Sequence, residues 1–198
     1  MMKEQCKEML KALTGKNNIY FMRRGNSAIR QSLRYARKKY KILYMQDQGG
    51  WITYPQLAKK LNFNVIEIST KHGHIRSLEI NDAALINSMA GYHSLLPMKN
   101  IKAGLLINDV SGSIGTEQAK YGDIIVGSFG RWKPLNIGKG GFIATDLEGF
   151  EEDYDEDYFQ KLKERLNDLD ERLKRFKERK DKVIRDLKGF ELINQEGI

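Results

Sequence analysis

One lysine in a glycine-rich stretch is the residue of this sequence best placed for covalent chemistry. Lys133 stands between a tryptophan and a proline, and paired glycines follow at positions 140 and 141. An aromatic ring and a restricted backbone can partly exclude water, which favours the neutral, nucleophilic form of an amine. Considered alone, the position is equally open to a functional lysine and to an ordinary turn lysine.

Other groups in the sequence could bind a flat, phosphorylated ligand. Asp109 comes after the apolar run 105–108 and offers a carboxylate, and Ser128 follows another apolar run with a hydroxyl. Trp51 comes after a loop and could lay its aromatic face over a flat ring. Gly25-Asn26-Ser27 opens a predicted helix, with Asn26 or Ser27 as the N-cap. The free backbone N–H groups and the positive dipole end of such a helix favour a phosphate.

Alternating strands and helices must position these groups. We expect helices over residues 1–14, 28–40 and 54–61, and strands over residues 41–45, 64–69, 84–88, 105–108 and 124–126. Strands separated by helical stretches, several of them continuous apolar runs, predict an α/β fold with a mostly parallel sheet between helices. Such sheets bind ligands at the carboxyl ends of their strands, which is where Asp109, Ser128 and the loop before Trp51 would lie.

The sequence changes character after Asp146. An acidic run over residues 151–157 precedes a long charged helix, so we divide the chain into an α/β domain, 1–149, and a C-terminal element, 150–198. Apolar residues of this helix recur at alternating steps of four and three, as in a coiled-coil seam. They are Leu162, Leu166, Leu169, Leu173, Phe176, Val183 and Leu187. Packing of this seam on the parent domain or within a dimer is favoured over an external partner.

Composition limits the classes of function. The 198 residues suffice for one domain with a real core, and no stretch approaches the roughly 20 apolar residues that span a membrane. The N-terminus lacks the apolar segment of a secretory signal, and the single Cys6 suits a reducing cytoplasm. A net charge of +8 leaves a basic nucleic-acid-associated protein as a minority alternative, without any zinc-finger or RNP signature to support it.

The remaining polar candidates have simpler interpretations. His72 and His74 have no neighbouring cysteine or carboxylate ligands, so we expect a solvated loop and no metal. His93 could line a pocket at a strand end. Arg131 and Lys139 could meet an anionic substrate or a neighbouring subunit's phosphate, although exposed loop charge is the simpler interpretation.

An amine, a carboxylate, an aromatic platform and a phosphate turn are the parts that a pyridoxal 5'-phosphate site requires. One segment resembles the signature of the DegT/DnrJ/EryC1/StrS aminotransferases, a family of fold-type I enzymes dependent on pyridoxal phosphate. It consists of Ser128-Phe129, three variable positions, Lys133 and then Gly140-Gly141. Three further segments are similar to segments of that family. The segment that binds the pyridine nitrogen resembles Asn108-Asp109-Val110-Ser111, and the phosphate turn resembles Gly25-Asn26-Ser27-Ala28. The segment that stacks on the cofactor ring resembles Trp51-Ile52-Thr53. The resemblance covers residues 25–145.

The resemblance implies a role for each matching residue. Lys133 would form a Schiff base with the cofactor and move protons, Asp109 would pair with the pyridine nitrogen, and Trp51 would stack on the ring. Gly25, Asn26, Ser27 and Ser128 would bind the phosphate. The family relationship also implies a homodimer that transfers an amino group from a small-molecule donor to a keto acceptor, for which a keto sugar is one candidate.

The sequence also departs from the family pattern. Gly112 stands where the family usually has His or Gln, and the charged helix takes the place of a C-terminal small domain that closes over substrate. A separate polypeptide could supply such a domain. The sequence thus predicts cofactor binding and leaves open a non-catalytic, reduced homologue that acts in assembly or regulation.

Overall fold

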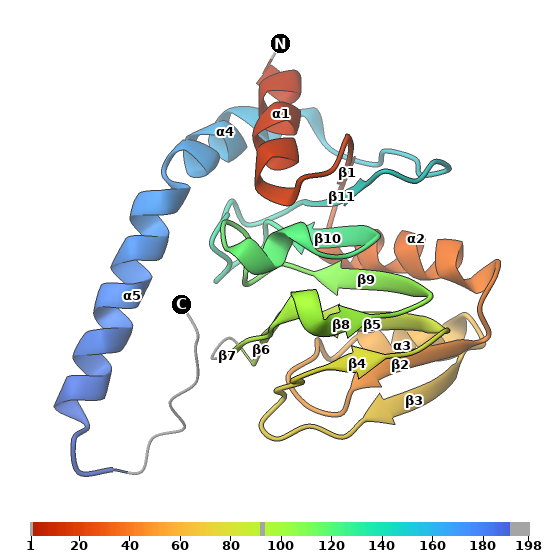
Figure 1. Ribbon diagram of the computed structural model, residues 1–198. Coiled ribbons are helices and arrows are strands. Elements are labelled where there is room, and N and C mark those ends of the chain that lie inside the picture. Colours follow the sequence, from red (N-terminus) through yellow and green to blue (C-terminus); the bar gives the residue numbers. More distant parts are fainter. Residues whose placement is uncertain (1, 92–93, 191–198) are drawn as a thin grey trace.

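The computed structural model describes residues 2–91 and 94–190, and its centre is a seven-stranded sheet (Figure 1). The strand order is β1-β11-β10-β9-β5-β2-β3. The strands are β1 (Asn18–Met22), β2 (Ile42–Gln46), β3 (Asn64–Ile68), β5 (Ala83–Asn87), β9 (Leu105–Asp109), β10 (Ile124–Ser128) and β11 (Gly141–Thr145). Strand β11 is antiparallel to both of its neighbours, whereas the other adjacent pairs are parallel. The predicted α/β fold with a mostly parallel sheet is confirmed.

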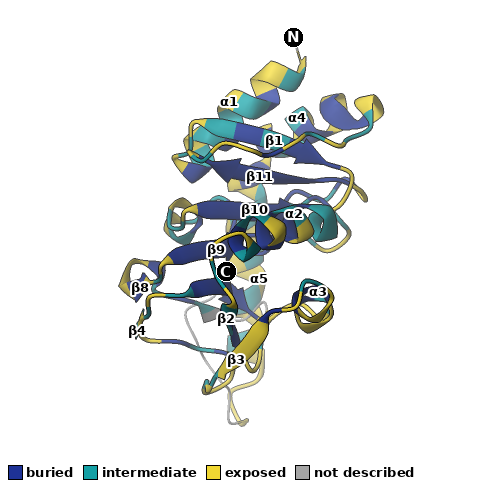
Figure 2. Cartoon of the chain, turned by 90° about the vertical axis from the view of Figure 1, so that its right-hand side faces the viewer, coloured by how far each residue is buried: buried dark blue, intermediate teal, exposed yellow. Residues whose placement is uncertain are grey.

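Helices cover both faces of this sheet. They are α1 (Met2–Thr14), α2 (Gly25–Arg37), α3 (Tyr54–Lys60) and α4 (Phe159–Asn167). Helix α5 (Leu169–Asp186) follows α4, and Leu169 is its buried residue. Along β10, Ile124 and Val126 pack in the core formed with α2 and α3, whereas Ile125 packs in the core formed with α1 and α4. This alternation follows from the two-residue period of a strand and explains why the run is apolar throughout. In the view of Figure 2 the central strands are buried, while the edge strand β3 is exposed.

Shorter elements connect the main strands or come just before α4. They are β4 (Leu78–Glu79), β6 (Met89–Ala90), β7 (Ser94–Leu95), β8 (Ile101–Lys102), and 3-10 turns at Met98–Asn100, Glu117–Lys120 and Glu156–Tyr158. Ala90, Met98 and Ile101 of these elements belong to a third apolar cluster over β5 and β9. Ala119 and Tyr158 of the two later turns pack instead in the core formed with α1 and α4.

The start of α2 differs from the prediction. The helix begins at Gly25 with Arg24 as its N-cap, and no side chain caps it, so the predicted N-cap at Asn26 or Ser27 is wrong. The side-chain oxygen of Asn26 instead accepts hydrogen bonds from Trp51 and Thr53. The Asn26 oxygen that would cap the helix therefore accepts hydrogen bonds from a distant loop instead.

The predicted charged C-terminal helix is present and is divided at Asp168 into α4 and α5. Leu162 and Leu166 are buried against the domain, whereas Val183 is 53% exposed. The first part of the apolar seam thus packs on the parent domain, and its far end does not. None of the helices within residues 2–91 and 94–190 combines the length and apolarity that crossing a membrane requires.

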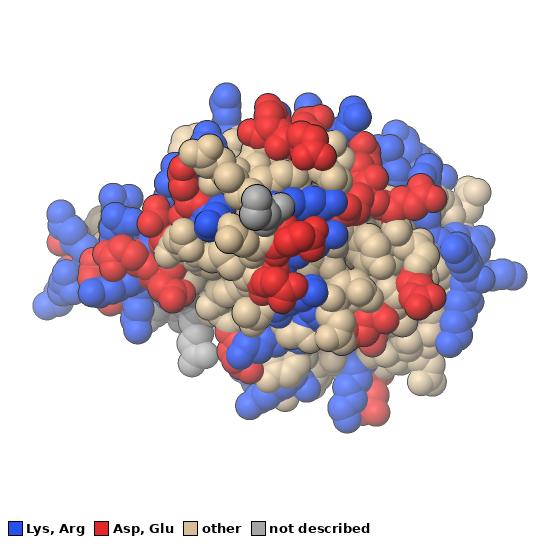
Figure 3. Space-filling view, turned by 90° about the horizontal axis from the view of Figure 1, so that it is seen from above, with Lys and Arg blue, Asp and Glu red and all other residues tan. Residues whose placement is uncertain are grey.

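The acidic run 151–157 is tied to basic residues of the domain. Its ion pairs join Glu152 to Lys7 at 3.1 Å, Asp153 to Arg23 at 2.7 Å, and Asp157 to Lys139 at 2.7 Å. Seen from above, acidic and basic side chains are interspersed over this face (Figure 3). The face therefore offers no continuous basic surface of the kind that nucleic acid binding favours.

Candidate active site

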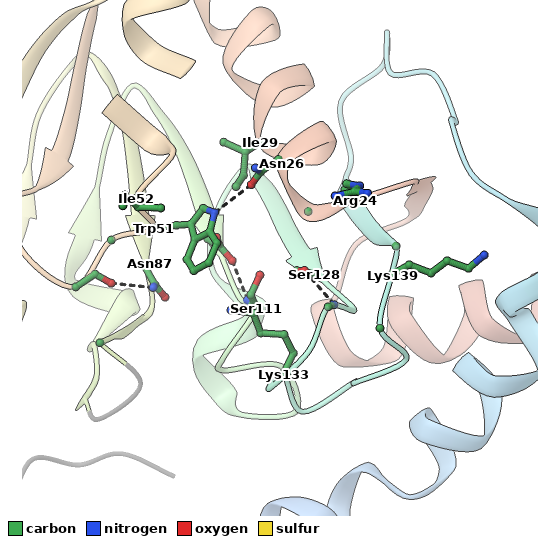
Figure 4. Close-up of a pocket in the computed structure, with 18 residues that line it drawn as sticks. Arg24, Asn26, Ile29, Trp51, Ile52, Asn87, Ser111, Ser128, Lys133 and Lys139 are labelled. Atoms are coloured by element: carbon green, nitrogen blue, oxygen red, sulfur yellow. Dashed lines mark hydrogen bonds between the residues drawn. The ribbon is translucent and has the colours of Figure 1, made fainter. Parts of the chain in front are cut away.

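All but one of the predicted site residues meet in one cavity of about 550 Å³ at the carboxyl ends of the parallel strands (Figure 4). Its walls include Lys133, Asp109, Trp51, Gly25, Asn26 and Ser128. Ser27 is not among the residues that line the cavity. The strand order places β9 between β10 and β5, so that the last residues of these strands, Ser128, Asp109 and Asn87, lie along one edge.

A hairpin between β10 and β11 carries Lys133. The hairpin is held by hydrogen bonds of the Phe129 backbone to Gly140 and Ile137, at 3.1 and 3.0 Å. Phe129 and Leu135 are buried in the core beneath α1 and α4. Trp132, in contrast, is 87% exposed and adopts a left-handed φ of 68°, which is rare for a bulky residue. The buried anchors and this backbone reversal direct Lys133 into the cavity and Trp132 to the surface.

Trp51 covers the amine of Lys133. The Lys133 Nζ lies 5.2 Å from the centroid of the Trp51 ring, within the range of a cation–π contact. Burial lowers the pKa of Lys133 from 10.5 to about 8, because the charged ammonium loses hydration. The amine is therefore available as a nucleophile at a pH where an exposed lysine is almost fully protonated.

The aromatic segment and the first turn of α2 are joined by hydrogen bonds. The indole Nε1 of Trp51 donates to the Asn26 Oδ1 at 3.1 Å (Figure 4). The hydroxyl of Thr53 donates to the same oxygen at 3.2 Å. These bonds fix the indole relative to the N-terminus of α2. The distance and orientation between a ring bound beneath Trp51 and an anion bound at the N-terminus of α2 would therefore be fixed.

Gly25 lies against the end of β10. A Cβ atom at this position would lie 2.7 Å from the Cβ of Ser128, which is too close for any side chain. The glycine therefore lets the first turn of α2 approach Ser128, and the helix N-terminus and a hydroxyl share one wall of the cavity. Backbone N–H groups at a helix N-terminus favour a phosphate.

Asp109 is a buried carboxylate with two hydrogen-bond donors. The backbone N–H of Ser111 donates to Oδ1 at 2.8 Å, and the hydroxyl of Tyr54 donates to Oδ2 at 2.5 Å. Burial raises the pKa of Asp109, while both donors act in the opposite direction by stabilising the carboxylate. Asp109 thus has a side-chain partner from α3.

Sequence reasoning missed several residues of this site. Asn87 ends β5 at the edge where Asp109 ends β9, so the same strand-end rule could have found it. Arg24 lines the cavity next to Gly25 but carries no local signal. Tyr54 contacts Asp109 across a sequence separation of 55 residues, and only the fold brings the two together.

The other polar candidates lie apart from the amine or outside the described residues. His72 and His74 do not line this cavity, and within the described ranges no three His, Cys, Asp or Glu residues are grouped to hold a metal. Lys139 lies at the cavity rim, points away from Lys133, and pairs with Asp157 (Figure 4). His93 lies outside the described residues.

The sequence matches no protein-family model and no curated protein, whereas the fold matches many solved structures. One is a GDP-4-keto-6-deoxymannose-3-dehydratase with bound GDP-perosamine, with a TM-score of 0.78, 12% identity, and coverage of 99% of this chain and 69% of that chain. Another is a protein from Bacillus cereus assigned as a PLP-dependent aminotransferase, with a TM-score of 0.69, 14% identity, and coverage of 100% and 68%. A third is a DegT DnrJ EryC1 StrS aminotransferase from Brucella abortus, with a TM-score of 0.68, 12% identity, and coverage of 94% and 64%.

These likenesses identify the fold as that of aminotransferases dependent on pyridoxal phosphate. The identities are too low to carry activity or substrate to this chain. The chain also spans only 64% of the Brucella abortus protein and 69% of the dehydratase.

Proposed function

We propose that this protein binds pyridoxal 5'-phosphate and acts as an aminotransferase. The observation that carries the proposal is the convergence of Lys133, Asp109 and Trp51 on one cavity of about 550 Å³. These residues come from the hairpin after β10, the end of β9 and the loop before α3. Only the folded chain brings an amine, a buried carboxylate and an aromatic face to one place.

The residues of the cavity fit the parts of the cofactor. The close approach of Gly25 to Ser128, which a Cβ atom would prevent, places the N-terminus of α2 beside the Ser128 hydroxyl, and backbone N–H groups at a helix N-terminus favour a phosphate. Trp51 offers its ring as one wall, and Asp109 offers a carboxylate that is 5% exposed. Lys133 has the lowered pKa that an amine needs to bond to an aldehyde near neutral pH.

When bound, pyridoxal phosphate supplies an aldehyde and a ring that withdraws electrons from the substrate α-carbon. Lys133 would hold the cofactor through its Nζ, and the same atom would accept and return a proton. Asp109 stabilises a protonated ring nitrogen through its negative charge. Trp51 excludes water from one face of the cavity, and the α2 N-terminus with Asn26 and Ser128 binds phosphate.

The proposal extends to substrate and assembly. We propose an amino acid donor and a keto sugar acceptor. Solved proteins that share the fold include a GDP-4-keto-6-deoxymannose-3-dehydratase and an aminotransferase involved in the biosynthesis of pseudoaminic acid. We propose a cytoplasmic homodimer, with the option that a separate small-domain subunit covers the cavity.

A second candidate function is assembly or regulation without catalysis. The observation that favours it is the far end of α5, where Val183 and Leu187 are 53% and 36% exposed. An exposed apolar stripe on a helix suits contact with another protein. This alternative differs from the first because it does not require bound cofactor.

Visible spectroscopy separates the two functions. Purified protein incubated with pyridoxal phosphate should become yellow, lose the visible band on borohydride reduction, and carry the label on Lys133 in peptide mass spectrometry. The Lys133→Ala variant should stay colourless, whereas Lys120→Ala, which removes an exposed lysine outside the cavity, should bind as the wild type does. Wild-type protein that stays colourless with added cofactor would favour the assembly function.

A further inference from the structure

A buried tyrosine outside the predicted site contacts its carboxylate. Tyr54 is 3% exposed, and its hydroxyl donates to the Asp109 Oδ2 at 2.5 Å. The other oxygen, Oδ1, accepts the backbone N–H of Ser111 at 2.8 Å. Each oxygen of this carboxylate thus has a donor, and Tyr54 provides the one that comes from a side chain.

Tyr54 is held by the turn that also carries Trp51. The Tyr54 backbone N–H donates to the Trp51 carbonyl at 2.9 Å, and Pro55 follows in the first turn of α3. A Cβ atom at Gly50 would lie 3.1 Å from the Tyr54 ring, so the glycine lets the ring pack closely. One short segment therefore places the indole over the amine and the phenol against the carboxylate.

We propose that Tyr54 is a positioning residue that keeps Asp109 ionised and fixed in the cavity, ready to meet the protonated ring nitrogen of the cofactor. This inference rests on the proposed function. The side chain that donates a hydrogen bond to the carboxylate belongs to α3. No sequence motif had connected this helix with the site.

The physical reason is the cost of a buried negative charge. A carboxylate shielded from water becomes protonated unless hydrogen-bond donors stabilise its charge, and a protonated carboxyl group no longer attracts a cation. Burial also raises the pKa of Tyr54 well above its ordinary value, so the phenol remains a donor throughout the physiological range. Replacement by phenylalanine keeps the ring and removes only the donor.

Cofactor titrations test the inference. Tyr54→Phe should weaken the binding of pyridoxal phosphate roughly tenfold to a hundredfold, the range for a hydrogen bond to a charged group. Loss of affinity on acidification should begin at a higher pH than in the wild type, because Asp109 takes up its proton earlier. The matched control is Tyr40→Phe, which removes a 2.6 Å hydrogen bond to the Gly104 carbonyl and should leave both the affinity and its pH profile unchanged.

The other titratable groups around the cavity are the same in every variant. Arg24, Lys133 and Lys139 line it together with Asp109, so their effects cancel when variants are compared. In an Asp109→Asn background, Tyr54→Phe should cause no further loss of affinity, because the charge that it supports is absent. A role limited to packing would instead produce the same loss in both backgrounds.

A second measurement needs no cofactor. Carbon-13 NMR of the cofactor-free protein should show a higher pKa for the Asp109 carboxyl group in Tyr54→Phe than in the wild type or Tyr40→Phe. Wild-type protein that fails to bind pyridoxal phosphate would overturn the proposed function and this inference with it. Wild-type binding, with an unchanged affinity and an unchanged Asp109 pKa in Tyr54→Phe, would overturn this inference alone.

Discussion

The lowered pKa of Lys133 predicts an amine that reacts differently from the other lysines of the cofactor-free protein. Burial brings its pKa from 10.5 to about 8. At pH 7, a pKa of 8 leaves roughly 10% of the amine neutral, compared with about 0.03% at a pKa of 10.5, a difference of roughly 300-fold. The neutral fraction should rise through pH 8, two to three pH units before that of an ordinary lysine.

Competitive labelling with trace acetic anhydride between pH 6 and pH 11, read by peptide mass spectrometry, measures this fraction for each lysine. Lys133 should show a midpoint near pH 8. Lys139 is the internal control, because Asp157 and Asp155 raise its pKa and should move its midpoint upward. The midpoint is the measure to compare, because restricted access changes the rate of labelling at every pH alike.

Trp51→Ala tests the cause of the lowered pKa. Removal of the indole admits water to Lys133, so its labelling midpoint should move back toward 10.5. Loss of the cation–π contact acts in the opposite direction, but at about 0.5–1 kcal/mol it corresponds to less than one pKa unit. A wild-type Lys133 midpoint equal to or above that of Lys139 would refute the reasoning, since the amine would then be hydrated and protonated.

Further predictions concern packing around the site and along the C-terminal helices. Gly25→Ala places a Cβ 2.7 Å from that of Ser128 and should lower the free energy of unfolding in urea by about 1–3 kcal/mol, whereas no change would contradict the close approach. In the same assay, Leu166→Ala should lower the free energy of unfolding by about 2–5 kcal/mol, and Val183→Ala should lower it by no more than about 0.5 kcal/mol. Equal losses of stability would contradict the difference in burial between the two residues. Cys6 is 0% exposed and burial raises its pKa to about 11, so Ellman's reagent at pH 8 should react only after denaturation, and rapid reaction of the native protein would argue against this burial.

The fold could be predicted from the sequence because its strands are continuous apolar runs. In β10, for example, Ile124, Ile125 and Val126 face two cores at once, and such a run is readable without knowledge of the partners. The cavity could be predicted as well, because carboxyl ends of parallel strands share an edge. That rule brought Asp109 and Ser128 together, and their roles toward a cofactor remain predictions.

What could not be predicted depends on contacts between distant segments. Local preference nominates Asn26 as an N-cap, but its oxygen is engaged by Trp51 and Thr53 from another loop. The partnership of Tyr54 with Asp109 likewise has no trace in either local pattern. The helix break at Asp168 falls inside a regular apolar repeat, where periodicity alone predicts an uninterrupted helix.

The hairpin that carries Lys133 leaves the sheet at Ser128 and returns to it at Gly141, and these two residues are paired. The hairpin thus forms its wall of the cavity from one continuous segment, whereas the opposing walls come from elements that are distant in the sequence. Opening this loop alone would withdraw the amine and leave the surfaces for ring and phosphate in place. Under the proposed function, sequence change within the loop would abolish covalent attachment of the cofactor through Lys133 and still permit its reversible binding to the rest of the cavity.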